Sequence, residues 1–260
     1  MENKIMGQTK LTFLGTGTSQ GVPMIGCSCE VCRSIDPRDQ RLRSSVLVEH
    51  EGLTILVDAG PDFRQQMLRA GVSHLDAILL THNHKDHTGG LDDIRAFNYI
   101  EKAASQIYCE KYVEDSLRME YSYAFAENKY PGAPEWDIHT IDEKPFCIKG
   151  VEIVPIRGLH YKLPVLGFRF GNIAYCTDMN HIPEEEFGKL KGLDHFIINT
   201  VRYRKHISHF ALEEAVAVAQ KAGAKHSWLT HLSHQLPCYS ELASELPDGI
   251  LPAYDGLVIE

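Results

Sequence analysis

Four side chains that can bind a metal ion fall within the six-residue segment 82–87, directly after the apolar run Ala77–Leu80. They are His82, His84, Asp86 and His87. Imidazole and carboxylate ligands suit zinc, manganese and iron, and strand alternation places His82, His84 and Asp86 on one side of an extended segment. His87 breaks the alternation, so a chain that turns there could supply a second ion. The segment predicts a metal centre rather than a solvated polar loop.

Further candidate ligands follow later apolar runs of the sequence. They are His160 after Val151–Ile156, Asp178 after Ile173–Cys176 and His231 after Trp228–Thr230. A single histidine at such a position is more often a hydrogen-bonded structural residue. Because α/β scaffolds assemble sites from several strand ends, the repetition favours one shared site.

Three of the seven cysteines, Cys27, Cys29 and Cys32, lie within six residues. An odd number of cysteines in a chain of this size favours metal binding over disulfides. A closed tetrahedral zinc site needs a fourth ligand, for which His234 is the candidate. The alternative interpretation is a loop with three free thiols.

The composition is that of an ordinary globular protein, with 43% hydrophobic and 23% charged residues in 260. No linker or repeat divides the chain, so we expect one domain over residues 1–260. The net charge of −9 disfavours long nucleic acid as a partner. The first ten residues lack the apolar core of a secretory signal, and no run approaches the ~18 apolar residues of a membrane span. We therefore expect a cytoplasmic protein without a membrane partner.

Short apolar runs predict strands, and three-to-four-residue periodicity predicts helices between them. The further strands are expected at Leu11–Leu14, Val46–Val48, Thr54–Val57, Leu166–Phe170, Phe196–Asn199 and Gly256–Ile259, and the helices at Pro61–Ala70, Val113–Ala126 and Ala211–Ala222. Ser208 is a candidate cap of the last helix, and segment 128–137 is an expected surface loop or lid. This pattern predicts an α/β protein with two central sheets and helices outside.

The run His82-x-His84-x-Asp86-His87 resembles the metallo-β-lactamase superfamily, and the likeness covers nearly the whole chain. It implies an αββα sandwich of two central mixed sheets flanked by helices. Asp58, after an early strand, matches a residue that supports the histidine segment from behind.

The resemblance also implies the ligand sets of two divalent ions, manganese or zinc. Residues matching His82, His84 and His160 hold one ion, those matching Asp86, His87 and His231 hold the other, and Asp178 matches the bridging carboxylate. An aspartate at this last position, rather than a cysteine, points to the phosphodiesterase branch.

The cysteine cluster, which follows Gly15-Thr16-Gly17-Thr18, resembles that of the PhnP family of phosphoribosyl cyclic phosphodiesterases. The resemblance implies a structural zinc at Cys27, Cys29, Cys32 and His234. His209 matches a catalytic histidine of this family and of the transfer-RNA 3′-processing ribonucleases. Without that resemblance, His209 would be read as a surface residue in the first turn of a helix.

We therefore expect a phosphodiesterase that hydrolyses a small cyclic phosphate or nucleotide diester, similar to phosphoribosyl 1,2-cyclic phosphate. A hydroxide shared by the two ions would attack phosphorus, with Asp86, Asp178 and the general acid His209 as catalytic residues. The alternatives are a transfer-RNA 3′-processing-type ribonuclease, although the chain lacks its Pro-x-Lys-x-Arg-Asn segment, and a non-catalytic metal-binding module. Arg43, Arg204 and Lys205 are either phosphate contacts or surface charges, and the resemblance leaves a homodimer open.

Overall fold

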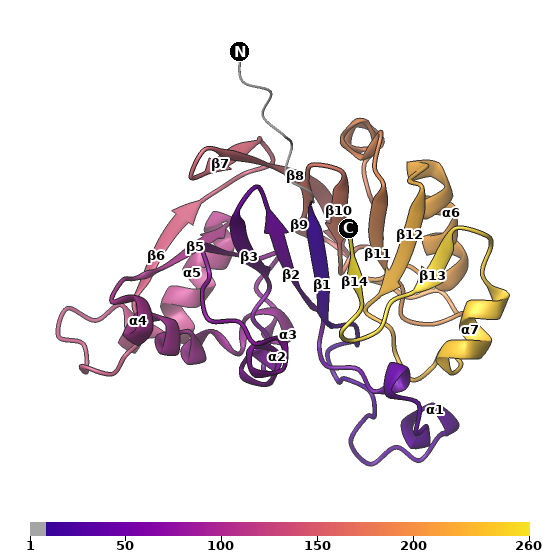
Figure 1. The fold of residues 1–260 in the computed structure, drawn as a ribbon, viewed down its shortest axis with the longest axis horizontal. Helices are drawn as coiled ribbons and strands as arrows, with labels where there is room; N and C mark the ends of the chain where they lie inside the picture. Colours follow the sequence, from indigo (N-terminus) through magenta and orange to yellow (C-terminus); the bar gives the residue numbers. More distant parts are fainter. Residues whose placement is uncertain (1–8) are drawn as a thin grey trace.

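Two mixed β-sheets form the centre of the computed structural model, which describes residues 9–260 (Figure 1). The first sheet has the order β14 (Val258–Ile259), β1 (Lys10–Gly15), β2 (Ser45–His50), β3 (Leu53–Val57), β4 (Ala77–Leu79), β5 (Ser105–Cys109), β6 (Trp136–Thr140). The second has the order β13 (Ile250–Pro252), β12 (His226–Thr230), β11 (His195–Asn199), β10 (Ile173–Cys176), β9 (Leu163–Phe170), β8 (Val151–His160), β7 (Phe146–Ile148). Each sheet is antiparallel on one side and parallel on the other.

Strand alternation explains why the two sheets pack face to face. In β1, Leu11 and Phe13 point into the core between the sheets, whereas Leu14 points to the outer face. In β10 of the other sheet, Tyr175 points into the same core and Cys176 points outward. Because both faces of these strands are apolar, each sheet needs a second layer on its outside.

Helices supply that outer layer on each sheet. The first sheet packs against helices that include α2 (Phe63–Ala70), α4 (Arg95–Glu101), α5 (Lys111–Glu120) and the 3₁₀ helix Leu91–Ile94. The second packs against α6 (Leu212–Ala222), α7 (Tyr239–Glu245) and the 3₁₀ helix Glu184–Leu190. The remaining short helices are α1 (Glu30–Arg33), α3 (Lys85–Thr88) and the 3₁₀ turns Pro37–Asp39 and Ser122–Ala124. This arrangement confirms the predicted αββα sandwich.

Several local predictions need correction. Ser208 does not cap α6, because the helix begins at Leu212 and Ala211 occupies the N-cap. The helix predicted over 113–126 is α5 followed by a separate 3₁₀ turn, and segment 128–137 already contains the first residues of β6. The sequence does not predict strands β5, β6, β7 and β13 or helices α1, α3, α4 and α7.

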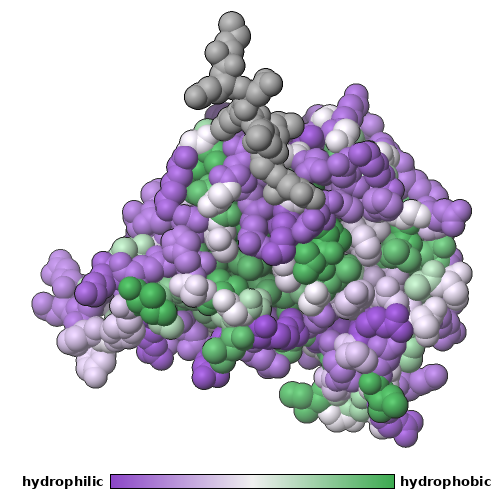
Figure 2. All heavy atoms as spheres, in the orientation of Figure 1, coloured by the Kyte–Doolittle hydropathy of each residue, from purple (hydrophilic) through white to green (hydrophobic). Residues whose placement is uncertain are grey.

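The surface in the orientation of Figure 1 is mainly hydrophilic, with scattered hydrophobic residues (Figure 2). Within the described part of the chain, no helix is both long and apolar enough to cross a membrane. The expectation that no secretory signal is present concerns residues 1–10, most of which lie outside the described part of the chain.

Candidate metal centre

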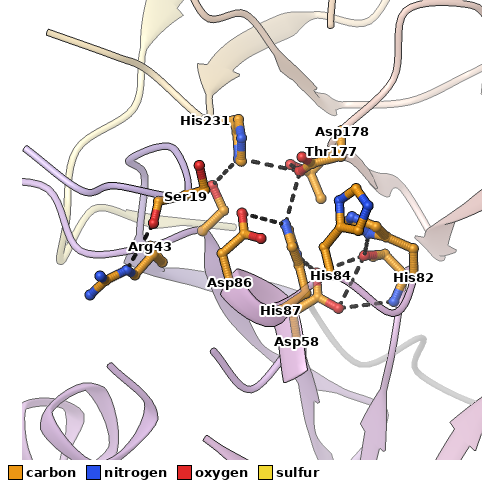
Figure 3. A network of polar contacts seen from close by, with 12 residues as sticks. Ser19, Arg43, Asp58, His82, His84, Asp86, His87, Thr177, Asp178 and His231 are labelled. Carbon is orange, nitrogen blue, oxygen red and sulfur yellow. Dashed lines mark hydrogen bonds and ion pairs between the residues drawn. The ribbon is translucent and has the colours of Figure 1, made fainter. Parts of the chain in front are cut away.

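All seven predicted ligands meet at one edge of the two sheets, where strands of both sheets end (Figure 3 labels all of them except His160). The chain leaves β4 at Leu79 and reaches His82 three residues later, and α3 carries Asp86 and His87. His160 is the last residue of β8, while Asp178 and His231 follow β10 and β12. The ligand atoms form two groups, each with all its members within 4.8 Å of one another. One group is His82, His84 and His160, and the other is Asp86, His87, Asp178 and His231.

Hydrogen bonds behind the histidine segment fix which ring nitrogen can bind a metal. Asp58 accepts hydrogen bonds from Nδ1 of His87, at 2.7 Å, and from the hydroxyl of Thr81, at 2.9 Å. Because the Thr81 hydroxyl donates to a carboxylate, it can accept from Nδ1 of His82, which lies 3.0 Å away. Each ring then carries its proton on Nδ1, which leaves the lone pair of Nε2 free for a cation.

Two buried atoms show that the site suits metal ions. Nε2 of His82 and Nε2 of His87 are buried and make no hydrogen bond within the described residues. Buried polar atoms without a partner are rare in folded proteins, so such atoms require a ligand. His160 has the same tautomer as His82 and His87, because its Nδ1 donates to the carbonyl oxygen of Ser208 at 2.8 Å and its Nε2 is left for a metal ion. The donor set therefore fits divalent cations that accept imidazole and carboxylate ligands.

Asp178 lies at the centre of the cluster. Its Oδ2 atom is 3.2 Å from Nε2 of His87 and 3.2 Å from Nδ1 of His231, and it accepts from the hydroxyl of Thr177 at 2.7 Å. Its other oxygen, Oδ1, faces His209 at 3.7 Å. Its ligand atom also lies within 4.8 Å of that of His160, a member of the first group, so this position suits a carboxylate that bridges two ions.

The electrostatics of the cluster favour bound cations. Burial alone would lower the pKa of His87, but the carboxylates of Asp178, Asp86 and Asp58 raise it well above the ordinary value. Burial would likewise raise the pKa of Asp178, yet the histidines around it, led by His231, lower it well below the ordinary value. A concentration of negative charge at His87 therefore attracts positive charge, which a metal ion can supply.

The backbone at the site is strained. Asp58, Asp178 and His231 have φ angles of 65°, 56° and 57°, in the left-handed region that residues other than glycine rarely adopt. Each of these residues follows a strand end, and the left-handed turn redirects the chain there. Strain of about 1–3 kcal/mol per residue persists only where surrounding contacts enforce it, as they do at functional sites.

His209 lies between the two groups of ligands. Its ring centroid is 4.6 Å from that of His160 and 4.9 Å from that of His231. Its Nδ1 atom is buried without a hydrogen-bond partner in the described residues, although Asp178 is nearby. Burial lowers the pKa of His209 to about 3. Burial therefore favours the neutral ring.

The cysteine cluster also assembles as predicted. The ligand atoms of Cys27, Cys29, Cys32 and His234 lie within 4.8 Å of one another, and Nδ1 of His234 is 3.4 Å from Sγ of Cys27 and 3.5 Å from Sγ of Cys29. Hydrogen bonding, first from the backbone of Cys32 and then from His234, lowers the pKa of Cys29 to about 6, while burial raises that of Cys32 to about 11. The geometry fits a closed tetrahedral zinc site.

Several supporting residues escaped sequence reasoning. Thr81 is adjacent to His82, which could have drawn attention to it, but Ser44, whose Oγ lies 3.1 Å from Nδ1 of His231, carries no local signal. Arg43 points away from the cluster (Figure 3), where it forms an ion pair with Asp62 and donates to the carbonyl oxygen of Ser19. Arg204 and Lys205 are exposed.

Comparisons with known proteins agree with this geometry. A family model described as "Beta-lactamase superfamily domain" matches residues 54–232. An octanoyltransferase from Porphyromonas gingivalis is 44% identical over 248 residues, which is 94% of this chain but 50% of that protein. The chain thus spans half the length of this relative.

Two solved structures are also similar to this chain, and each similarity covers nearly all of both chains. The crystal structure of a new diphosphatase from the PhnP family is 40% identical, with a TM-score of 0.90 over 97% of this chain and 98% of that one. Zn²⁺-bound PqqB from Methylobacterium extorquens, at 19% identity, shares the fold with a TM-score of 0.78 over 96% of this chain and 99% of that one.

Proposed function

The chain belongs to the metallo-β-lactamase superfamily and, within it, to the PhnP family, and from this premise we propose that it is a phosphodiesterase acting on a small cyclic phosphate or nucleotide diester. Membership of these families makes it a metal-dependent hydrolase. The observation that carries the narrower proposal is the placement of Asp178 between two sets of metal ligands, with His209 facing the same carboxylate.

The residues that would hold the metal ions divide as the ligand groups do. His82, His84 and His160 would hold one ion, Asp86, His87 and His231 would hold the other, and Asp178 would contact both. Two divalent ions held there, manganese or zinc, would supply a hydroxide nucleophile near neutral pH and would neutralise charge on the phosphoryl oxygens.

The chain's own residues then fix geometry and proton position. Asp58 and the carbonyl of Ser208 hold protons on Nδ1 of His87 and His160, so the rings keep their orientation during turnover. Nδ1 of His209 faces the site, and a proton held there can be donated to the leaving oxygen. Because burial lowers the pKa of this ring to about 3, negative charge on the bound phosphoryl group must raise it before the proton is transferred.

The cysteine cluster has a separate proposed role. A structural zinc held by Cys27, Cys29, Cys32 and His234 would fasten the N-terminal loop to the segment that carries His231. Its contribution would be stability and alignment rather than chemistry.

The test is hydrolysis of bis-p-nitrophenyl phosphate by protein loaded with manganese or zinc. We expect activity in the wild type, no activity in His84→Ala, and a strong loss in His209→Ala when the substrate has a poor leaving group. Activity that survives His84→Ala would remove the metal mechanism. Undiminished turnover of the poor-leaving-group substrate by His209→Ala would remove the general acid.

A substrate panel then separates the remaining alternatives. It contains a ribose 1,2-cyclic phosphate, 2′,3′-cyclic nucleotides, a dinucleotide with a diphosphate linkage and a transfer-RNA precursor. The diphosphate is included because the similar PhnP-family structure is that of a diphosphatase. Octanoyl transfer belongs to the name of a protein twice as long, so it is not carried over to this chain. Preference for the transfer-RNA precursor would favour the ribonuclease alternative.

A further inference from the structure

Segment 202–209 is a loop that is fixed over the ligand cluster by contacts at several points. The guanidinium of Arg202 donates to the carbonyl oxygens of Arg204 and Lys205, at 3.1 and 3.0 Å. Asn180 donates to the carbonyl of Ile207 at 3.3 Å, and His160 donates to the carbonyl of Ser208. Because one of these contacts comes from a predicted metal ligand, the loop has a fixed position relative to the metal centre.

His206 is held within this loop in a defined orientation. The backbone N–H of Ser208 donates to Nδ1 of His206 at 3.3 Å, and the Ser208 hydroxyl lies at the same distance. Since a backbone amide can only donate, Nδ1 of His206 is the acceptor and its proton resides on Nε2. That Nε2–H group makes no hydrogen bond within the described residues, and the side chain is half-buried.

The imidazole of His206 lies next to His209. The two ring centroids are 5.0 Å apart, with an angle of 48° between the ring planes. His209 in turn contacts the rings of His160 and His231. His206 therefore stands one ring further from the ligand cluster than His209.

We propose that His206 is a substrate-binding residue whose Nε2–H donates a hydrogen bond to a phosphoryl oxygen that the metal ions do not contact. This inference rests on the proposed phosphodiesterase function. It assigns different tasks to the two neighbouring imidazoles: Nδ1 of His209 faces the reacting centre, and Nε2 of His206 holds the substrate. Burial lowers the pKa of His206, and the proposed hydrogen bond needs only the Nε2–H group, which the neutral and the protonated ring both carry.

Two isosteric variants separate substrate binding from loop support. In His206→Asn the side-chain oxygen can replace Nδ1 and keep the contact with Ser208, but no donor reaches the position of Nε2. In His206→Gln the amide nitrogen can occupy that position. We expect kcat/KM for a poor-leaving-group diester to fall about 10–100-fold in His206→Asn, the range for loss of a hydrogen bond to a charged group, and to recover at least partly in His206→Gln. The inhibition constant of inorganic phosphate should rise in His206→Asn.

The controls separate failure of this inference from failure of the proposed function. Metal content should be unchanged in both variants, and His226→Asn, an exposed histidine at the opposite end of β12, should match the wild type. If kcat/KM were retained in His206→Asn but lost in His206→Gln, His206 would be assigned to loop support and the inference would be overturned. Wild-type activity and wild-type inhibition by phosphate in both variants would overturn it as well. A wild type that hydrolyses no phosphodiester would instead overturn the proposed function.

Discussion

Replacing Asp58 by asparagine should weaken metal binding without weakening the fold. Asp58 is fully buried and accepts hydrogen bonds from the backbone N–H and hydroxyl of Thr81 and from Nδ1 of His87. In Asp58→Asn the amide oxygen can still serve Thr81, which turns the NH₂ group towards His87. Because NH₂ can only donate, Nδ1 of His87 must accept, and the ring proton moves to Nε2, the atom that faces the metal site.

The size of the effect follows from these contacts. Loss of a partner that orients a ligand histidine costs about 10–100-fold in metal affinity, or about 1.4–2.8 kcal/mol. The metal-free protein should respond differently. Burial raises the pKa of Asp58 despite its hydrogen bonds, so the ionised carboxylate is costly within the fold, and asparagine removes that cost. The metal-free variant should melt at the wild-type temperature or above it.

The assay pairs a metal titration against a chromophoric chelator with thermal unfolding of the metal-free and metal-loaded proteins. A matched control is Asp76→Asn, a buried aspartate that precedes β4, at the end of the strand away from His82. It should lose stability but keep metal affinity. A metal affinity of Asp58→Asn within twofold of wild type would refute the argument from the His87 tautomer. If metal-free Asp58→Asn lost as much stability as metal-free Asp76→Asn, the weaker metal binding would instead be attributed to unfolding.

Three further predictions follow from other sites. Cys29→Ser should contain about one zinc per chain fewer than the wild type, by elemental analysis, whereas the exposed Cys147→Ser should keep the full count; equal counts would refute the cysteine site. Gly60→Ala should lower the free energy of unfolding by about 1–3 kcal/mol and reduce metal binding, because the added Cβ would lie 2.0 Å from the backbone oxygen of Asp86. In the control Gly188→Ala the added Cβ meets nothing within 4 Å, so metal binding should be unchanged. Similar metal binding in both variants would contradict this prediction. Burial would raise the pKa of Asp76, but hydrogen bonds led by that from Lys149 lower it, so the carboxylate stabilises the fold at pH 7 and this contribution is lost as the pH falls below about 4. The stability difference between wild type and Asp76→Asn in urea unfolding should therefore shrink in acid, and a constant difference would show that the charge of Asp76 does not matter.

Sequence reasoning located the metal ligands because they follow strands that are easy to recognise. Runs such as Ile173–Cys176 are apolar on both faces, since one face meets the opposite sheet and the other meets helices. The polar residue that ends such a run stands out. The same logic missed β6, because an edge strand with half-buried side chains lacks a clear apolar pattern.

Contacts between distant segments could not be predicted in this way. Ser44 approaches His231, and the carbonyl of Ser208 orients His160, only because the fold brings these segments together. The start of α6 was misplaced for a related reason. The side chain of Glu214 accepts from the backbone N–H of Ala211, so the helix begins without the Ser208 cap that the local sequence favours.

The division of the ligands between the two sheets sets the order in which the protein can mature. Asp58 and the segment 82–87 emerge early in synthesis, but His160, Asp178 and His231 arrive with the second sheet. A nascent chain that ends before residue 160 lacks a ligand of each ion, because Asp178 and His231 are also still to come, and one that ends before residue 231 still lacks a ligand of the second ion. Both ligand sets can therefore be completed only after the second sheet has been synthesised and has docked on the first.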